Sequence, residues 1–423
     1  MLRSRIILPL VERIENREIL RKVDFLAEHH SLSFEERKVR QKQSIFENLE
    51  WAKNEVPYYK DLFSSISFDP DKIKQDLKFI EEIPPLTKDI ILEQGSRMKA
   101  TSLLKEKRIG CKTGGSTGKK VVIDYNQEAA DWASAVTLYA RSLIGKQLGD
   151  KELHFASDFG DVPPLKAKMR EAAKNFSLNR KNVFYKDFEN ENIQDMIRII
   201  REDRPTLVHC HPSTMYAIAE AMGGPVKDPL FQVFESSGEL LDARKRAKIQ
   251  ETFDCKVIDR YGLAEFGVVA YESNEDSRLN VFDSIVYPEI VDGEITLTGL
   301  FNKLMPLIRY KTGDMAELIE GPEGYYFQNM LGRIHDRLEI DGKVYLTHYI
   351  QDVLDHRVRG VKEFQIKKNS DHYELRLVTE FGANKEAISE KIKNYFPSQL
   401  AIKFINHDDL ELVGWRGKFR YVI

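Results

Sequence analysis

Residues 112–120 form the stretch KTGGSTGKK, in which three glycines, a serine and two threonines lie between lysines. Glycines let a backbone approach a ligand closely, and hydroxyls and lysines suit an anion. A Walker A loop is excluded, because Thr113 stands where its first glycine belongs and Lys120 stands where its Ser or Thr holds magnesium. The segments around this loop must therefore decide its chemistry.

Three interpretations of the loop remain. Gly114 to Gly118 satisfy the GxSxG pattern of a hydrolase nucleophile elbow, with Ser116 as the nucleophile. That elbow needs a helix directly after the serine, whereas KKVVIDY (119–125) is β-branched and alternating and predicts a strand. The favoured interpretation is a loop between two strands that binds a phosphate through backbone N–H groups and hydroxyls. A simple glycine-rich turn is the third.

Composition sets broad limits on the function. The 423 residues suffice for one large and one small domain, and the net charge of -3 gives no electrostatic reason to bind nucleic acid. No apolar run approaches the ~18 residues of a membrane span. The three cysteines include no CxxC pair, which fits a reducing compartment. A cytoplasmic protein without a transmembrane segment is expected.

The order of predicted elements indicates an α/β fold. Residues 1–100 are mostly helical, with one helix over 34–55 that stops before Pro57 and another capped by Thr87. Helix and strand signals then alternate, with Ser213 as a candidate N-cap, and strands dominate from about residue 280. After Arg333, a hairpin and a helix form a small α+β unit. We predict a large multi-sheet domain over 1–334 and a small mobile domain over 335–423.

Several motifs, taken in order, resemble the adenylate-forming superfamily of acyl-CoA synthetases, adenylation domains and luciferases. The early segments VPYYKDLF and IPPLTKD are similar to the phenylacetate–CoA ligase branch, which includes capsule-biosynthesis homologues. The resemblance spans nearly the whole chain and implies the fold of that superfamily. Its motifs are TGGSTGKK (113–120), SSGE (236–239), RYGLAEFG (260–267), MPLIRYKTGD (305–314), LGRIHDRLEIDG (331–342) and GKFRYVI (417–423).

This resemblance implies a role for individual residues. Glu265 would hold magnesium, Tyr261 would lie against the adenine, and Asp314 would accept the ribose hydroxyls. Arg333 would donate to the ribose, and Lys418 would reach the reacting carboxylate and α-phosphate from the small domain. The remaining nucleotide-binding candidates are Thr113, Gly114, Gly115, Ser116, Thr117, Gly118, Lys120, Ser237, Gly238, Glu239 and Gly262.

The substrate pocket carries a weaker signal. Its candidate residues are His154, Asp158, His211 and Ser213, and Asp158 could pair with a substrate amine or hydroxyl. His209 and His211 are expected on one face of a strand, where a metal would still need a third ligand. At the hinge, His335 replaces the family's usual acidic residue, and Asp336 is the candidate substitute.

The resulting prediction is an ATP- and magnesium-dependent ligase that activates a small carboxylic or amino acid as an acyl-adenylate. Coenzyme A is a candidate acceptor, and a place in polysaccharide or secondary metabolism follows from the capsule-biosynthesis resemblance. The alternatives are a silent binding homologue of the same fold and a serine hydrolase acting through Ser116.

Overall fold

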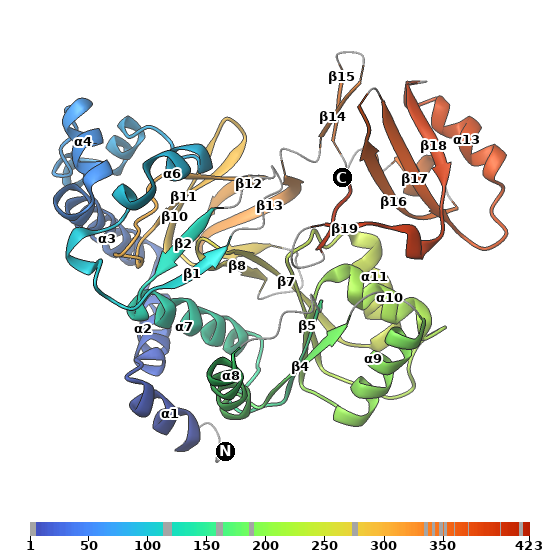
Figure 1. Cartoon of the computed structure of the whole chain (residues 1–423), viewed down its shortest axis with the longest axis horizontal. Helices are drawn as coiled ribbons and strands as arrows, with labels where there is room; N and C mark the ends of the chain where they lie inside the picture. The colour runs from blue at the N-terminus through green and yellow to red at the C-terminus, as the bar shows by residue number, and fades with distance from the viewer. Residues whose placement is uncertain are drawn as a thin grey trace.

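The chain folds as α/β, with a large multi-strand sheet and a smaller α+β C-terminal domain, as predicted (Figure 1). The structure is a computed structural model. It describes residues 6–112, 121–157, 164–185, 190–272, 278–333, 337–340, 343–346, 350, 353–358, 360–370, 372–397, 399–413 and 418–423.

Most of residues 6–100 form helices, as their pattern predicts. The predicted helix over 34–55 begins at a capping box between Ser33 and Glu36, and its successor begins with Pro57 in the first turn. Thr87 caps the last of these helices by accepting from the Ile90 N–H. They are α1 (Leu8–Glu15), α2 (Ile19–Ser31), α3 (Phe34–Glu55), α4 (Pro57–Ser65), α5 (Lys72–Gln75) and α6 (Lys88–Gln94).

An eleven-stranded sheet forms the frame of the large domain, in the order β10-β11-β12-β13-β9-β8-β7-β6-β5-β3-β4. Its parallel half runs from β4 to β7, and each crossover carries a helix. The strands of this half are β3 (Glu152–Ser157), β4 (Arg180–Tyr185), β5 (Leu207–Cys210), β6 (Val233–Ser237) and β7 (Lys256–Leu263). The helices are α7 (Gln127–Leu143), α8 (Leu165–Ser177), α9 (Asn190–Asp203), α10 (Pro212–Ala221) and α11 (Ala243–Phe253).

The other half of this sheet is antiparallel and carries the N-terminal helices. Side chains of α3 donate to its backbone and to the loop that follows, for example Asn48 to the Gly299 carbonyl and Trp51 to the Lys303 carbonyl of the loop. A separate hairpin of β1 (Ile109–Lys112) and β2 (Val122–Tyr125) flanks the glycine-rich loop. The antiparallel strands are β8 (Gly267–Glu272), β9 (Leu279–Val281), β10 (Val286–Val291), β11 (Glu294–Gly299), β12 (Tyr310–Gly321) and β13 (Gly324–Arg333).

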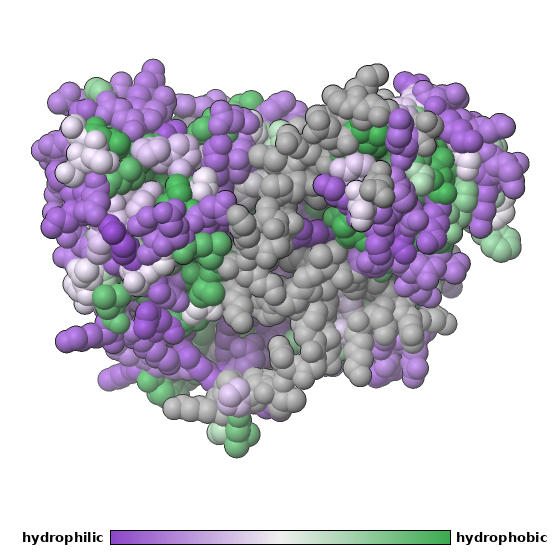
Figure 2. Space-filling model, turned by 45° about the horizontal axis from the view of Figure 1, so that its top comes forward, coloured by the Kyte–Doolittle hydropathy of each residue, from purple (hydrophilic) through white to green (hydrophobic). Residues whose placement is uncertain are grey.

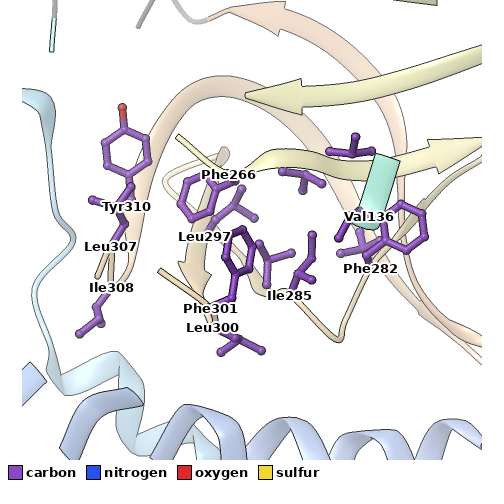
Figure 3. Packing of buried hydrophobic residues seen from close by; sticks show 14 of the residues in the cluster. Val136, Phe266, Phe282, Ile285, Leu297, Leu300, Phe301, Leu307, Ile308 and Tyr310 are labelled. Carbon is purple, nitrogen blue, oxygen red and sulfur yellow. The ribbon is translucent and has the colours of Figure 1, made fainter. Parts of the chain in front are cut away.

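Two apolar cores hold the large domain together. One joins the N-terminal helices to the antiparallel strands, and Figure 3 shows part of it, with Phe266, Leu297 and Phe301 packed together. The second lies between the parallel strands and helices α9 to α11. The residues of β3 divide between the two faces of the sheet, because Leu153 and Phe155 enter the second core while Glu152 and His154 point the other way.

The small domain has a core of its own, formed by residues between 338 and 422. A helix, α13 (Lys385–Lys393), packs on a three-stranded sheet of β16 (Val361–Lys368), β17 (Tyr373–Thr379) and β18 (Leu400–Phe404). The final residues bridge to β16 through the pair Ile366 and Val422. Two hairpins complete the domain: β14 (Arg337–Ile340) with β15 (Lys343–Leu346), and β19 (Leu412–Val413) with β20 (Lys418–Phe419). The boundary at 334/335 stays a prediction, because residues 334–336 lie outside the described ranges.

The face in Figure 2 is mostly hydrophilic over the described residues, and its apolar residues lie in small groups. Within the described part of the chain, no helix has the length and apolar character needed to cross a membrane.

Candidate active site

Strands β7 and β12 bring two of the predicted nucleotide residues into contact. The Tyr261 hydroxyl donates to Asp314 Oδ2 at 2.8 Å, and both residues are buried. Arg333 is the backbone partner of Asp314 across β12 and β13, so three residues far apart in sequence meet. An aromatic and an acidic side chain thus meet at one place on the sheet, next to the backbone of Arg333.

Glu265 lies in the turn between β7 and β8, four residues after Tyr261. The Tyr310 hydroxyl donates to Glu265 Oε1 at 2.7 Å, and the glutamate is only 6% exposed. Figure 3 shows Tyr310 at one end of the apolar cluster, with its hydroxyl pointing away from it. Tyr125 supports the same turn by donating to the Ala264 carbonyl at 3.0 Å. The carboxylate is therefore held in position by Tyr310 and has little contact with solvent.

Glycine at position 262 lets the backbones of β7 and β8 lie close together. The pairing of β7 with β8 shifts register between Tyr261 and Gly262, and a Cβ at Gly262 would lie 3.1 Å from the Gly267 carbonyl oxygen. Gly267 itself has φ +75°, in the left-handed region that favours glycine. These two glycines shape the turn that carries Glu265.

The SSGE segment ends β6 and is tied to the start of α10. His211 Nδ1 donates to the Ser237 carbonyl at 2.7 Å, and Glu239 Oε2 accepts from the Ser213 N–H at 3.2 Å. Gly238 between them has φ +86°. The SSGE segment therefore lies directly against the β5–α10 connection.

Two expectations for this region are wrong. Ser213 is not the N-cap of α10, because the helix begins at Pro212 and its cap is His211. Proline is favoured in the first turn, since its missing N–H would have no partner there. His211 also lies beyond the end of β5, so it does not share a strand face with His209, whose ring instead lies 4.8 Å from that of His154.

Several predicted residues lie outside the described part of the chain. These are Asp158, the hinge pair His335 and Asp336, and the loop residues Thr113, Gly114, Gly115, Ser116, Thr117, Gly118 and Lys120. The strand β2 does follow the loop, as its sequence predicts, where a nucleophile elbow would need a helix. Lys418 is described by its backbone, which pairs with Val413 in the β19–β20 hairpin.

A charged network beneath this site was not predicted. The Arg141 guanidinium from α7 binds Glu152 at 2.8 Å and Glu235 at 2.6 Å, with all three side chains at most 2% exposed. Burial alone would raise the pKa of Glu235, but Arg141 and His209 hold it well below its usual value. One pattern in the sequence could have indicated this network. Charged or imidazole residues occupy alternate positions in otherwise apolar strands, as Glu152 and His154 do.

The two histidines of the network are uncharged near neutral pH. Burial lowers the pKa of His209 to about 4, and burial also lowers the pKa of His154 well below its usual value. His209 lies 2.7 Å from Glu235 Oε2, and His154 lies 3.0 Å from Glu152 Oε2. Neither imidazole therefore adds positive charge here.

The small domain docks on the large domain at α10 and α11. The Tyr421 hydroxyl accepts from Lys245 Nζ at 2.9 Å and donates to Asp242 Oδ2 at 3.1 Å. Burial alone would lower the pKa of Lys245, but Tyr421 and Asp242 raise it well above its usual value. Arg244 donates to the Val361 carbonyl of β16 at 2.5 Å. Because Asp242 follows Glu239 by three residues, this contact brings the C-terminal segment close to the SSGE segment.

The carboxylate of Glu265 suits a metal ion that is bound partly by the protein and partly by the phosphates of a substrate. Among the described residues, no group of three or more His, Cys, Asp or Glu side chains could hold a metal ion. Magnesium binds through one or two carboxylates and the phosphates of a substrate, keeping several waters. The fixed carboxylate of Glu265 fits such a site.

Comparisons with known proteins agree on one group. The chain is 25% identical over 369 residues to the protein CapK of Staphylococcus aureus, covering 84% of this chain and 81% of CapK. It is 24% identical over 365 residues to the phenylacetate–coenzyme A ligase of Pseudomonas putida, covering 79% and 78%. The chain is therefore similar to CapK and to phenylacetate–coenzyme A ligases over about four fifths of its length. No protein-family model matches it.

Solved structures support the same fold. A 2-hydroxyisobutyryl-CoA ligase in its postadenylation state superposes with a TM-score of 0.69 at 18% identity, covering 93% of this chain and 90% of that chain. An anthranilate CoA ligase in complex with anthranoyl-AMP superposes with a TM-score of 0.52 at 16% identity. The fold of adenylate-forming ligases is therefore shared over nearly the whole chain.

Proposed function

We propose that this protein is an ATP-dependent ligase that activates a carboxylic acid as an acyl-adenylate and transfers the acyl group to coenzyme A. The observation that carries the proposal is the contact of Tyr261 with Asp314 beside the fixed carboxylate of Glu265. A base-stacking ring, a ribose acceptor and a magnesium ligand are needed together at an adenylation site. The relatives on the phenylacetate–coenzyme A ligase branch support the same reaction class.

In the first step, a carboxylate oxygen of the acid attacks the α-phosphorus of ATP, and the bond to the β-phosphate breaks to release pyrophosphate. The chain contributes position and charge to this step. In our proposal, Tyr261 lies against the adenine, and Asp314 with Arg333 binds the ribose hydroxyls. Magnesium, when bound, offsets charge on the phosphates. Glu265 would hold the ion.

In the second step, the sulfur of coenzyme A attacks the acyl carbon, its proton is lost and AMP leaves. Lys418 is proposed to serve the first step alone, by placing positive charge near the reacting carboxylate and α-phosphate. The docking of Tyr421 near the SSGE segment supports this role, since Lys418 precedes Tyr421 by three residues. The glycine-rich loop is proposed to bind the departing pyrophosphate.

Pyrophosphate exchange tests the proposal. Labelled pyrophosphate should enter ATP only when a suitable acid is present, because the adenylation step must be reversible on the protein. Lys418→Ala should slow exchange by ~10²–10³, the usual effect of removing one preorganised group, while ATP affinity changes little. Given pre-made acyl-adenylate and coenzyme A, the same variant should form thioester at nearly the wild-type rate. If no acid in a broad panel supports exchange, the ligase proposal fails. The remaining interpretation is a protein of the same fold that binds nucleotide without catalysing adenylation.

A further inference from the structure

The charged network has two parts. In its interior, the positive and negative charges are equal in number, whereas its rim carries more positive than negative charge. In the interior, the cations Arg141 and Lys146 face the carboxylates of Glu152 and Glu235, and Lys146 Nζ lies 2.8 Å from Glu152 Oε1. All four side chains are at most 3% exposed. Two positive and two negative charges thus cancel where water is excluded, as a buried cluster requires.

The rim adds two guanidinium groups to the same two carboxylates. Arg180 Nε binds Glu152 at 2.8 Å, and Arg260 Nη1 binds Glu235 at 3.3 Å. Among the described residues, no other carboxylate contacts the side chain of either arginine. The Tyr271 hydroxyl also donates to Glu235, so it brings no negative charge. The network therefore holds four cations against two carboxylates, an excess of two positive charges.

Arg260 makes this excess available to a ligand. Its side chain is 17% exposed, whereas the carboxylate of Glu235 that it binds is fully covered. Arg260 Nε is buried and has no hydrogen-bond partner among the described residues. A buried donor without an acceptor is costly, so an anionic oxygen at this point would be stabilised.

The position of Arg260 joins this excess charge to the reaction site. Arg260 pairs with Ser237 at the carboxyl end of β6, and ligands of α/β sheets bind at the carboxyl ends of parallel strands. It precedes Tyr261, and its Nε lies 3.8 Å from where a Cβ of Gly262 would be. An acid with its reacting carboxylate beside the nucleotide could therefore place a second group against Arg260.

We propose that the substrate acid carries a second anionic group, and that Arg260 binds this group. The proposal rests on the proposed function and specifies its substrate class. The second group supplies an acceptor to Arg260 Nε and offsets the excess positive charge. An apolar acid such as phenylacetate supplies neither, so it should be a poor substrate. The same chemistry could come from a second carboxylate or from a phosphonate.

The test compares acids with and without a second charge in pyrophosphate exchange, and succinate and butyrate form a pair of equal chain length. Succinate and glutarate represent the second carboxylate, 3-phosphonopropionate represents the phosphonate, and butyrate and phenylacetate lack a second charge. Wild type should prefer an acid with two charges by about 10–100-fold in kcat/KM. An acid with one charge leaves the buried Arg260 Nε without an acceptor, and this cost lowers its kcat/KM. Preference between the two kinds of diacid identifies the second group. Preference for butyrate or phenylacetate would overturn the proposal and leave the ligase function intact.

Two variants separate a binding role from a structural one. Arg260→Gln should raise KM for the preferred acid at least tenfold with little change in KM for ATP. The matched control is Arg246→Gln, because Arg246 is 19% exposed and binds a buried carboxylate, Glu272, at 2.8 Å on the α11 side of the sheet. Equal effects of the two variants on the KM of the acid would contradict the proposal.

If no acid supports exchange, the proposed ligase function is refuted, but anion binding at Arg260 is not. A binding measurement therefore tests the anion site separately. Succinate and 3-phosphonopropionate, each with a non-hydrolysable ATP analogue, should raise the melting temperature of wild type. Arg260→Gln should lose that increase, while Arg246→Gln should keep it. If neither diacid stabilises wild type more than butyrate does, the anion-binding proposal fails as well.

Discussion

The contact between Tyr421 and α11 should control the first half-reaction. We predict that Tyr421→Phe slows adenylation and does not slow acyl transfer. The variant removes the hydroxyl through which the small domain bonds to Lys245 and Asp242 of the large domain. It keeps the ring, which stacks on Phe364 within the small domain with ring centroids 4.7 Å apart. The change therefore weakens the docking of the domains more than the folding of the small domain.

The size of the effect follows from two hydrogen bonds to charged partners. Such bonds contribute about 1.5–3 kcal/mol each, but Lys245 and Asp242 still pair with each other at 3.0 Å when the hydroxyl is gone. A net loss of about 2 kcal/mol lowers the ratio of docked to undocked molecules ~30-fold. If the docked pose is about tenfold favoured in wild type, adenylation slows about fourfold, and ~30-fold is the upper limit.

The assay measures each half-reaction separately, by pyrophosphate exchange and by thioester formation from pre-made acyl-adenylate. Tyr373→Phe is the control, because Tyr373 lies on β17 of the same domain, beside Lys368 and away from α11. It should leave both rates unchanged. Equal slowing of both half-reactions by Tyr421→Phe, or no slowing of either, would refute the positioning role.

Two further predictions concern carboxylates of the β7–β8 region. Glu265→Gln keeps the acceptor for Tyr310 but removes the charge, so half-maximal adenylation should require at least tenfold more magnesium; an unchanged requirement would show that Glu265 does not hold the ion. Burial and the nearby Glu272 raise the pKa of Asp259 to about 7, so the folded state keeps a proton that the unfolded state releases above pH ~4. The free energy of unfolding should therefore fall as pH rises from about 4 to 7. Asp259→Asn, which cannot ionise, should stabilise the protein by up to ~4 kcal/mol at pH 8 and little at pH 4 in urea titrations. Equal shifts at both pH values would contradict this assignment.

The fold was largely predictable because its elements carry strong local signals. The apolar spacing of 34–55 and the proline that follows it gave both ends of α3, and the Thr87 cap was also correct. The prediction of Ser213 as an N-cap was wrong, since the preference of Pro212 for the first turn outweighed the hydroxyl of its neighbour. Pairing of β7 with β8, and of β12 with β13, depends on contacts between distant segments that local patterns do not contain.

The candidate site was only partly predictable, for a related reason. Motif order indicated Tyr261, Asp314 and Glu265, but it could not indicate that tyrosine hydroxyls hold both carboxylates. The network around Glu235 was missed because its members come from α7, the loop after it and six different strands. Each looks like an isolated polar residue in the sequence, and only the packing of the sheet against α7 brings them together.

The order of residues on β7 has a consequence for how this protein can diverge. Arg260 and Tyr261 are consecutive, yet Arg260 binds Glu235 on β6 and Tyr261 binds Asp314 on β12. Under our proposals, neighbouring codons therefore encode acid preference and nucleotide recognition, but the two side chains have separate partners. A lineage can exchange one acid for another through substitutions around Arg260 while selection keeps Tyr261 and Asp314 constant. The same separation offers protein engineers a route to new substrates that leaves the adenylation chemistry in place.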